Sequence, residues 1–144
     1  VDAGVKYKRY CSDRTCTSVA NFDNFNFERK QTFKNKKHQK IYDIVLKAQE
    51  KCIKEARAGM KACEIDKIAR DFISQAGYAK YFVHSTGHGV GLDIHEFPNI
   101  NSKNELIIED NMVFTVEPGI YIPNEFGVRI EDTVYMKNGR AIIL

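Results

Sequence analysis

The chain has 144 residues, of which 43% are hydrophobic and 28% charged, and its formal net charge is +3. These values indicate an ordinary soluble globular protein with one domain, and they exclude a disordered or fibrous chain. No apolar run approaches the length of a membrane-spanning helix, and the four cysteines form no CxxC pair. We therefore expect a cytoplasmic protein with reduced thiols and no membrane partner.

Residues 1–20 are predicted to form two strands joined by a turn. Asp2 and Asp13 are eleven residues apart, and the midpoint of that interval falls between Tyr7 and Lys8. In an antiparallel hairpin folded at this midpoint, the two carboxylates face each other across the ladder, close enough to share a cation.

Residues 21–36 are polar and rich in asparagine, so we expect a long loop there. Residues 29–40 form a basic run, and four phenylalanines lie in or just before it. Basic residues interleaved with aromatic ones are able to bind single-stranded nucleic acid, but such a run is more often a solvated face. Because the net charge is only +3, we favour a solvated loop that leads into a helix.

Two amphipathic helices are predicted next. Apolar residues recur at helical spacing from about Lys37 and end before Gly59, and a second stripe runs from Ile65 to Ala76. Gly77 follows this second stripe at the position where a left-handed residue commonly ends a helix. Both helices are expected to cover a sheet as scaffold.

A glycine-rich segment after Gly77 carries three of the four histidines, His84, His88 and His95. Its glycines would let the backbone approach a ligand closely. In an extended chain His84 and His88 share one face, whereas His95 lies on the other face unless the glycines bend the path. Such a bend would let one histidine bind a metal ion while others meet a substrate.

Residues 112–117, 128–135 and 141–144 have strand-like patterns. The chain therefore reads as strands, then two helices, then strands again, without the regular alternation of a parallel α/β fold. This order predicts the α+β class.

Glu117 and Glu131 are fourteen residues apart, and their midpoint is Asn124, inside a segment with turn chemistry, Pro-Asn-Glu-Phe-Gly. A hairpin folded there would bring the two carboxylates together. A surface salt bridge is the ordinary explanation for a carboxylate, but it does not suit Glu117, which follows an apolar strand expected to be buried. A buried carboxylate is costly unless it is paired or bound to a metal ion.

Four carboxylates and one imidazole can together hold two divalent cations; they are Asp2, Asp13, His88, Glu117 and Glu131. Oxygen-rich coordination with one imidazole suits Mn²⁺, Co²⁺, Fe²⁺ or Zn²⁺ in a paired site better than a tetrahedral structural zinc. Two such ions about 3.5–4 Å apart can hold a bridging hydroxide and polarise a carbonyl, which makes hydrolysis the natural reaction class.

Four sequence blocks carry a family resemblance: VDAGVKYKRYCSDRTCT, HSTGHGVGLDIHE, NMVFTVEPGIYI and GVRIEDTV. In this order and spacing they resemble the metal-binding motifs of the pita-bread metallopeptidases, most closely the proline-directed branch of Xaa-Pro aminopeptidases and Xaa-Pro dipeptidases. The resemblance implies a pita-bread fold of the α+β class. It also implies two divalent metal ions, manganese first, with cobalt, zinc or iron as alternatives. The implied substrate is a peptide with proline in the second position, hydrolysed by a metal-bridging hydroxide.

Carried over by position, the resemblance makes the same five side chains the metal ligands, with Asp13 bridging the two ions. It gives Glu117 a second role, as the acceptor of a proton from the bridging water. His95 matches a residue that hydrogen-bonds the substrate and steadies the tetrahedral intermediate, and His84 matches a substrate-side histidine. Arg129 and Tyr121 match positions just outside the ligands, where an arginine orients them.

The resemblance covers nearly the whole chain except residues 21–36, and two positions depart from it. Arg9 replaces a glycine of the first hairpin, and Cys16 replaces an arginine near Asp13. Family members carry a further half of the catalytic domain upstream, so we expect residues 1–144 to be a partial metallopeptidase catalytic domain. Such a piece is expected to be poorly active, to expose an apolar surface and to form homo-oligomers.

Three alternatives to a proline-directed peptidase stay open. Methionine aminopeptidase activity is disfavoured by the histidine pair at 84 and 88 and by the GVRIED block. A non-catalytic pita-bread module that binds peptides or proteins is disfavoured because all five ligands are present. Nucleic-acid binding through residues 29–40 would show as salt-dependent affinity for single strands.

Overall fold

The computed structural model describes residues 9–12 and 35–144, and for residues 9–12 it describes the backbone alone. Two α-helices, α1 (Lys36–Glu55) and α2 (Ala62–Gln75), are followed by a short 3₁₀ turn, η1 (Ala79–Tyr81). In chain order the strands are β1 (Arg9–Ser12), β2 (Gly87–Gly89), β3 (Glu96–Ile100), β4 (Val113–Val116), β5 (Gly119–Ile122), β6 (Phe126–Ile130), β7 (Asp132–Lys137) and β8 (Arg140–Ile143).

Both predicted helices are confirmed, with ends close to those expected. α1 begins after Asn35, whose side chain accepts a hydrogen bond from the Lys37 backbone N–H at 2.9 Å. α2 ends at Gln75, Ala76 caps it, and Gly77 then takes a φ of +87°, as the sequence predicted. Within the described ranges, neither helix is long and apolar enough to cross a membrane.

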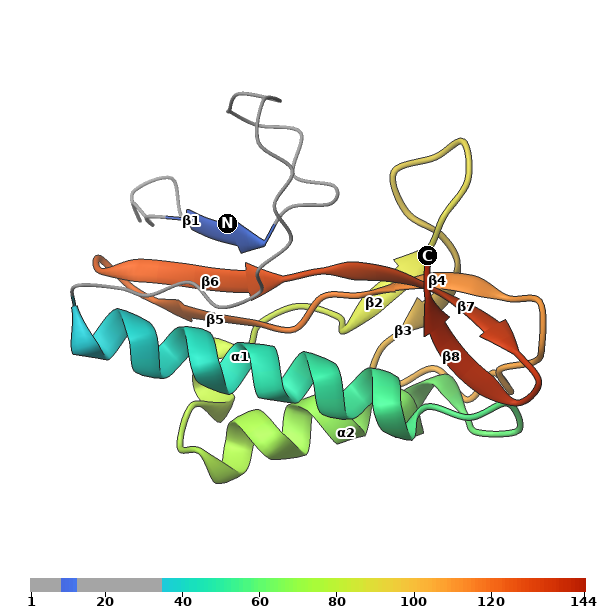
Figure 1. The fold of residues 1–144 in the computed structure, drawn as a ribbon, viewed down its shortest axis with the longest axis horizontal. Helices are drawn as coiled ribbons and strands as arrows, with labels where there is room; N and C mark the ends of the chain where they lie inside the picture. The colour runs from blue at the N-terminus through green and yellow to red at the C-terminus, as the bar shows by residue number, and fades with distance from the viewer. Residues whose placement is uncertain (1–8, 13–34) are drawn as a thin grey trace.

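The strands form two sheets, which lie on the same side of the helix pair (Figure 1). One sheet has the order β1-β6-β5, and the other has the order β3-β2-β4-β7-β8. α1 and α2 pack against each other, and α1 runs along the β5–β6 hairpin, whereas β1 lies on the far side of β6 (Figure 1). The core between these layers is apolar and includes Ile41, Val45, Ile65, Phe114, Ile120 and Val128.

The hairpin predicted around Asn124 is present and has the predicted register. Gly119 pairs with Arg129 in the β5–β6 ladder, and the turn residue Asn124 has a φ of +60°. Further from the turn, Val116 pairs with Asp132 in the β4–β7 ladder. Both ladders share the same midpoint, although they belong to different sheets. Glu117 and Glu131 therefore stand opposite each other at the junction of the two sheets.

The strand-like pattern predicted over residues 128–135 is confirmed, but it is divided between two strands, β6 and β7, which belong to different sheets. On the opposite arm, the Glu117 backbone N–H donates to the Thr86 carbonyl at 2.7 Å instead of continuing the ladder. Pro118, which follows, has no N–H to donate. The ladder therefore breaks at the level of the two acidic residues, where both arms pass from one sheet to the other.

Two strands, β2 and β3, were not among the predicted ones, and β5 was expected only as an arm of the hairpin around Asn124. β3 contains Pro98, which cannot donate to a ladder, so its short segment lacks an ordinary strand pattern. The expected turn between Tyr7 and Lys8 lies outside the described residues. The loop was expected over residues 21–36; residues 21–34 also lie outside the described residues, and Lys36 already belongs to α1. Of the first hairpin, only β1 is described, and it pairs in parallel with β6.

Candidate metal site

Three of the five predicted ligands converge at the junction of the two sheets. One ligand atom from each of His88, Glu117 and Glu131 lies within 4.8 Å of the other two. His88 belongs to β2, Glu117 follows β4, and Glu131 lies between β6 and β7. Within the part of the chain that the structure describes, this is the one group of three such residues able to hold a metal ion. Asp2 and Asp13 lie outside the described residues.

β2 brings His88 to the site because it runs very close to β4. A Cβ built on Gly87 would lie 1.7 Å from the Thr115 carbonyl oxygen, so only glycine fits there. Likewise, a Cβ on Gly89 would lie 2.0 Å from the Phe97 carbonyl oxygen. The glycines that the sequence suggested for approach to a ligand are therefore needed for the approach of neighbouring strands.

The chemistry of the donor set fits a divalent cation. His88 Nδ1 lies 2.7 Å from the Gly89 carbonyl oxygen, so the proton belongs on Nδ1 and the Nε2 lone pair faces the site. That Nε2 lies 3.1 Å from Glu117 Oε1. Two ligand atoms each about 2.0–2.2 Å from a shared ion are about 3–4 Å apart when they bind at neighbouring positions. An imidazole lone pair beside a carboxylate oxygen is the arrangement that such an ion would stabilise.

Glu117 is a buried carboxylate, with 9% of its surface exposed. Its Oε1 accepts a hydrogen bond from the Thr115 hydroxyl at 2.9 Å, and its Oε2 lies 3.7 Å from Arg129 Nε. These partners offset part of the cost of burying the charge. Arg129 therefore lies next to Glu117.

Thr115 is a residue that the sequence reasoning missed. Its buried hydroxyl accepts a hydrogen bond from the His88 backbone N–H at 3.0 Å and donates to Glu117, so it joins two of the converging residues. A signal was available, since residues two apart on a strand share a face and Thr115 precedes Glu117 by two.

His84 and Tyr121 form a second group beside the cluster. His84 Nδ1 lies 2.7 Å from the Ser85 carbonyl oxygen, and its Nε2 lies 2.9 Å from the Tyr121 hydroxyl. Burial lowers the pKa of His84 below its usual 6.5, which favours the neutral ring. A neutral ring protonated on Nδ1 accepts the Tyr121 hydrogen bond at Nε2. Tyr121 therefore fixes the orientation of the His84 ring.

His95 reaches the same region from the loop between β2 and β3. Its ring centroid lies 4.7 Å from that of His88, with the ring planes at 77°. The loop projects from the end of the five-stranded sheet (Figure 1), and His95 is exposed on it. The change of face that the glycines were expected to allow is therefore present.

A family model described as metallopeptidase family M24 matches residues 1–138 of the chain. A Xaa-Pro dipeptidase from Pyrococcus furiosus is 47% identical over 141 residues, which are 98% of this chain and 37% of that protein. The chain thus spans just over a third of the length of this relative.

Solved structures agree with this match. The prolidase from Pyrococcus furiosus superposes with a TM-score of 0.74 and 51% identity, covering 76% of this chain and 32% of that one. An X-Pro aminopeptidase from Thermotoga maritima superposes with a TM-score of 0.73 and 44% identity, covering 76% of this chain and 31% of that one. These matches confirm the predicted pita-bread fold and the resemblance on which it rested. The chain belongs to metallopeptidase family M24.

Proposed function

We propose that this chain supplies the metal-binding part of a peptidase that hydrolyses Xaa-Pro dipeptides. The observation that carries the proposal is the convergence of His88, Glu117 and Glu131, whose ligand atoms lie within 4.8 Å of one another. Two relatives are named Xaa-Pro dipeptidase, and this chain covers 37% of the length of each. Their names support the choice of substrate.

The proposed ligand set adds Asp2 and Asp13 to the three converging residues. β1 supports this addition, because its last residue, Ser12, pairs with Ile130, directly before Glu131. Four carboxylates and one imidazole suit two divalent cations, with manganese first and cobalt, zinc or iron as alternatives. When bound, such a pair would supply an activated water nucleophile and polarise the scissile carbonyl.

Glu117 is proposed to move the proton. Its carboxylate is buried and fixed by the Thr115 hydroxyl, so it is held in one orientation beside the cluster. It would accept a proton from the attacking water and deliver it to the leaving proline nitrogen. Arg129 Nε lies 3.7 Å from Glu117 Oε2, so its positive charge offsets part of the cost of burying the carboxylate.

The histidines are proposed to bind the substrate. His95, beside His88, would donate a hydrogen bond to the oxygen on which negative charge develops. His84, held by Tyr121, would contact the substrate on the other side of the cluster. The peptide bond before a proline has no N–H. A site that holds its substrate through His84 and His95 does not need this N–H as a hydrogen-bond donor.

Hydrolysis of Ala-Pro by the purified, metal-loaded protein tests the proposal. Weak cleavage of Ala-Pro is expected, as for a partial catalytic domain; His88→Ala is expected to abolish this cleavage, and the surface variant Lys67→Met is expected to keep it. Cleavage of Met-Ala in preference to Ala-Pro would instead indicate a methionine aminopeptidase. Binding of Ala-Pro without cleavage of either peptide would indicate a non-catalytic peptide-binding module.

The match to an X-Pro aminopeptidase gives a second candidate function, the removal of an N-terminal residue from longer Xaa-Pro peptides. Comparing Ala-Pro with Ala-Pro-Gly separates the two. A dipeptidase is expected to prefer Ala-Pro, whereas an aminopeptidase is expected to prefer the tripeptide.

A further inference from the structure

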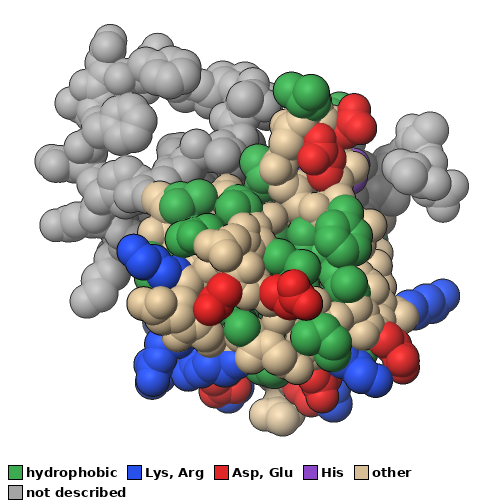
Figure 2. Space-filling view, turned by 90° about the vertical axis from the view of Figure 1, so that its right-hand side faces the viewer, with side chains coloured by type: hydrophobic (Ala, Val, Ile, Leu, Met, Phe, Trp, Pro, Cys, Tyr) green, Lys and Arg blue, Asp and Glu red, His purple; other side chains and the backbone are tan. Residues whose placement is uncertain are grey.

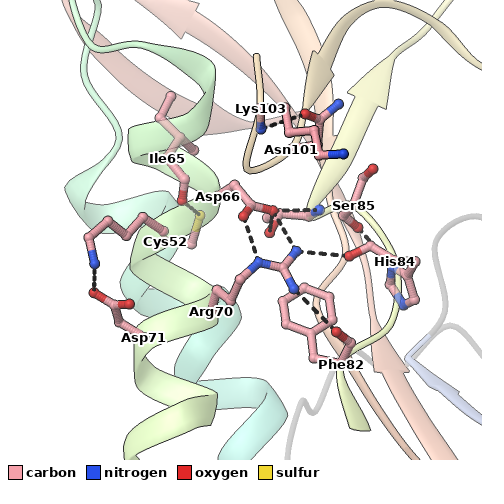
Figure 3. Close-up of polar contacts among 12 residues, drawn as sticks. Cys52, Ile65, Asp66, Arg70, Asp71, Phe82, His84, Ser85, Asn101 and Lys103 are labelled. Atoms are coloured by element: carbon pink, nitrogen blue, oxygen red, sulfur yellow. Dashed lines mark hydrogen bonds and ion pairs between the residues drawn. The ribbon is translucent and has the colours of Figure 1, made fainter. Parts of the chain in front are cut away.

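Helix α2 carries a buried ion pair that the proposed chemistry does not use. The Asp66 side chain is fully buried, and Arg70 lies one helical turn later. The guanidinium donates two hydrogen bonds to the carboxylate, from Nε to Oδ2 at 2.7 Å and from Nη2 to Oδ1 at 2.9 Å (Figure 3). A buried charge is costly even when it is paired, so an ordinary scaffold helix has no need of such a pair.

The pair also binds the segment that leads into the candidate site. Arg70 donates to the carbonyl oxygens of Phe82 at 3.2 Å and His84 at 2.9 Å (Figure 3). Asp66 Oδ1 accepts from the Thr86 hydroxyl at 2.8 Å and from the Thr86 backbone N–H at 3.2 Å. Residues 82–86 are therefore tied to α2 by four hydrogen bonds, three of which involve their backbone.

A row of stacked groups runs from Arg70 to the substrate-side histidine. The guanidinium carbon lies 4.2 Å from the centre of the Phe82 ring. Phe82 meets His84 edge to face at 5.2 Å, and His84 meets Tyr121 in the same way at 5.3 Å. Arg70 thus constrains His84 twice, through its backbone carbonyl and through the neighbouring ring.

The two members of the pair act toward different parts of the site. Arg70 holds the carbonyl of His84, which we assign to the substrate. Asp66 holds Thr86, whose carbonyl accepts the Glu117 backbone N–H at 2.7 Å. A change at Arg70 should therefore alter substrate binding before it alters the metal cluster.

We infer that Arg70 is a positioning residue for substrate binding: anchored by Asp66, it fixes the backbone of residues 82–84 and so the place of the His84 imidazole. The inference rests on the proposed function for the role of His84. Lysine cannot replace arginine here, because a single ammonium cannot span a carboxylate and two carbonyls with the geometry of a planar guanidinium.

The test compares Arg70→Lys and Arg70→Met with Lys67→Met. Lys67 pairs with Asp71 at the same spacing on the same helix, at 2.6 Å, but both of these side chains are exposed. Both Arg70 variants are expected to raise the KM for Ala-Pro by about tenfold or more and to change kcat by less than about threefold. The affinity for Mn²⁺, measured by calorimetry, is expected to stay within about twofold. Lys67→Met is expected to leave all three quantities unchanged.

A second measurement does not depend on peptidase activity. In ¹⁵N NMR spectra of the metal-free protein, the resonances of the His84 ring nitrogens are expected to change position in Arg70→Lys and to be unchanged in Lys67→Met. If the wild-type protein cleaves no peptide, the proposed function fails, but these spectra still test the positioning of His84. The inference would be overturned if the His84 resonances or the KM for Ala-Pro were unchanged in the Arg70 variants. It would also be overturned if both Arg70 variants lost the folded state.

Discussion

At the scale of single residues, the site depends on how one buried carboxylate is held. Glu117 ends an apolar strand, and its backbone N–H, its Oε1 and its Oε2 each have a partner from a different part of the chain. Thr115 has a central place among these partners, because its hydroxyl links Glu117 to the backbone of His88. Groups of this kind orient metal ligands and commonly affect metal affinity when they are removed.

We expect Thr115→Val, which keeps the shape but removes the hydroxyl, to weaken Mn²⁺ binding by about 10–100-fold. Thr133→Val is the matched control, because Thr133 pairs with Thr115 across the β4–β7 ladder. Calorimetric titration of both variants checks the prediction. Equal affinities in the two variants would show that the Thr115 hydroxyl has no role in metal binding.

His84 is expected to make the folded state less stable in acid. Its pKa is lowered by burial, so below pH 6.5 the unfolded chain takes up a proton that the folded chain refuses. The free energy of unfolding should therefore fall as the pH drops from 7 toward 5. In the His84→Gln variant this free energy should fall less steeply. Urea unfolding of both proteins at several pH values, with a chelator present, measures the two slopes. Identical slopes would contradict this account of His84.

At the scale of elements, the features that could be predicted from the sequence are those that a local pattern of residues determines. The period of the apolar residues placed both helices, and Gly77 marked the end of α2. The midpoint between Glu117 and Glu131 placed the hairpin turn at Asn124, and the structure has that register. Each of these features depends on residues close together in the chain or on one symmetric turn.

The features that the sequence did not predict depend on contacts between distant segments. The break between β6 and β7 arises because Glu117 turns to Thr86, thirty-one positions earlier. The roles of Asp66 and Arg70 appear only when α2 packs beside residues 82–86. On a helix, an aspartate followed four residues later by an arginine reads as an ordinary surface pair. No periodicity marks such contacts, so sequence reasoning alone had no basis to find them.

The close approach of β2 to β4 gives a prediction at this scale. Gly87→Ala would place a methyl group 1.7 Å from the Thr115 carbonyl oxygen, so the strands must separate at a cost of about 1–3 kcal/mol or more. Gly77→Ala is the control, because its φ of +87° also makes alanine unfavourable, by about 1–2 kcal/mol, but nothing lies within 4 Å. Mn²⁺ affinity should fall in Gly87→Ala and persist in Gly77→Ala. The reverse order would contradict the proposed placement of His88 by β2.

At the scale of the whole molecule, the described surface carries unusual apolar exposure around the β2–β3 loop. Leu92 and Ile94 on this loop are 104% and 84% exposed, and Phe97 and Val83 nearby in the chain are also exposed. Figure 2 shows hydrophobic side chains gathered across the face at this end of the molecule, with lysines and arginines toward its lower margin. Exposed apolar groups of this kind favour association.

We expect the 144-residue chain to self-associate through this surface, in line with the proposed homo-oligomer. Replacing Leu92 and Ile94 by glutamine should shift the chain toward the monomer, because the apolar area available for contact is reduced. Sedimentation velocity at several concentrations measures the shift, and Ile142→Gln, a change at an exposed apolar residue on β8, is the control. A wild-type chain that is monomeric at all concentrations would refute the expectation.

The central claim is that the fold gathers His88, Glu117 and Glu131 to hold a metal ion. Calorimetric titration of Mn²⁺ into the metal-free protein tests it most directly, with Glu117→Gln compared against Glu105→Gln, an exposed carboxylate paired only at the surface with Lys61. We predict two ions bound per wild-type chain, unchanged binding in Glu105→Gln, and loss of at least one ion or about 100-fold weaker binding in Glu117→Gln. Equal binding by the two variants would contradict the claim.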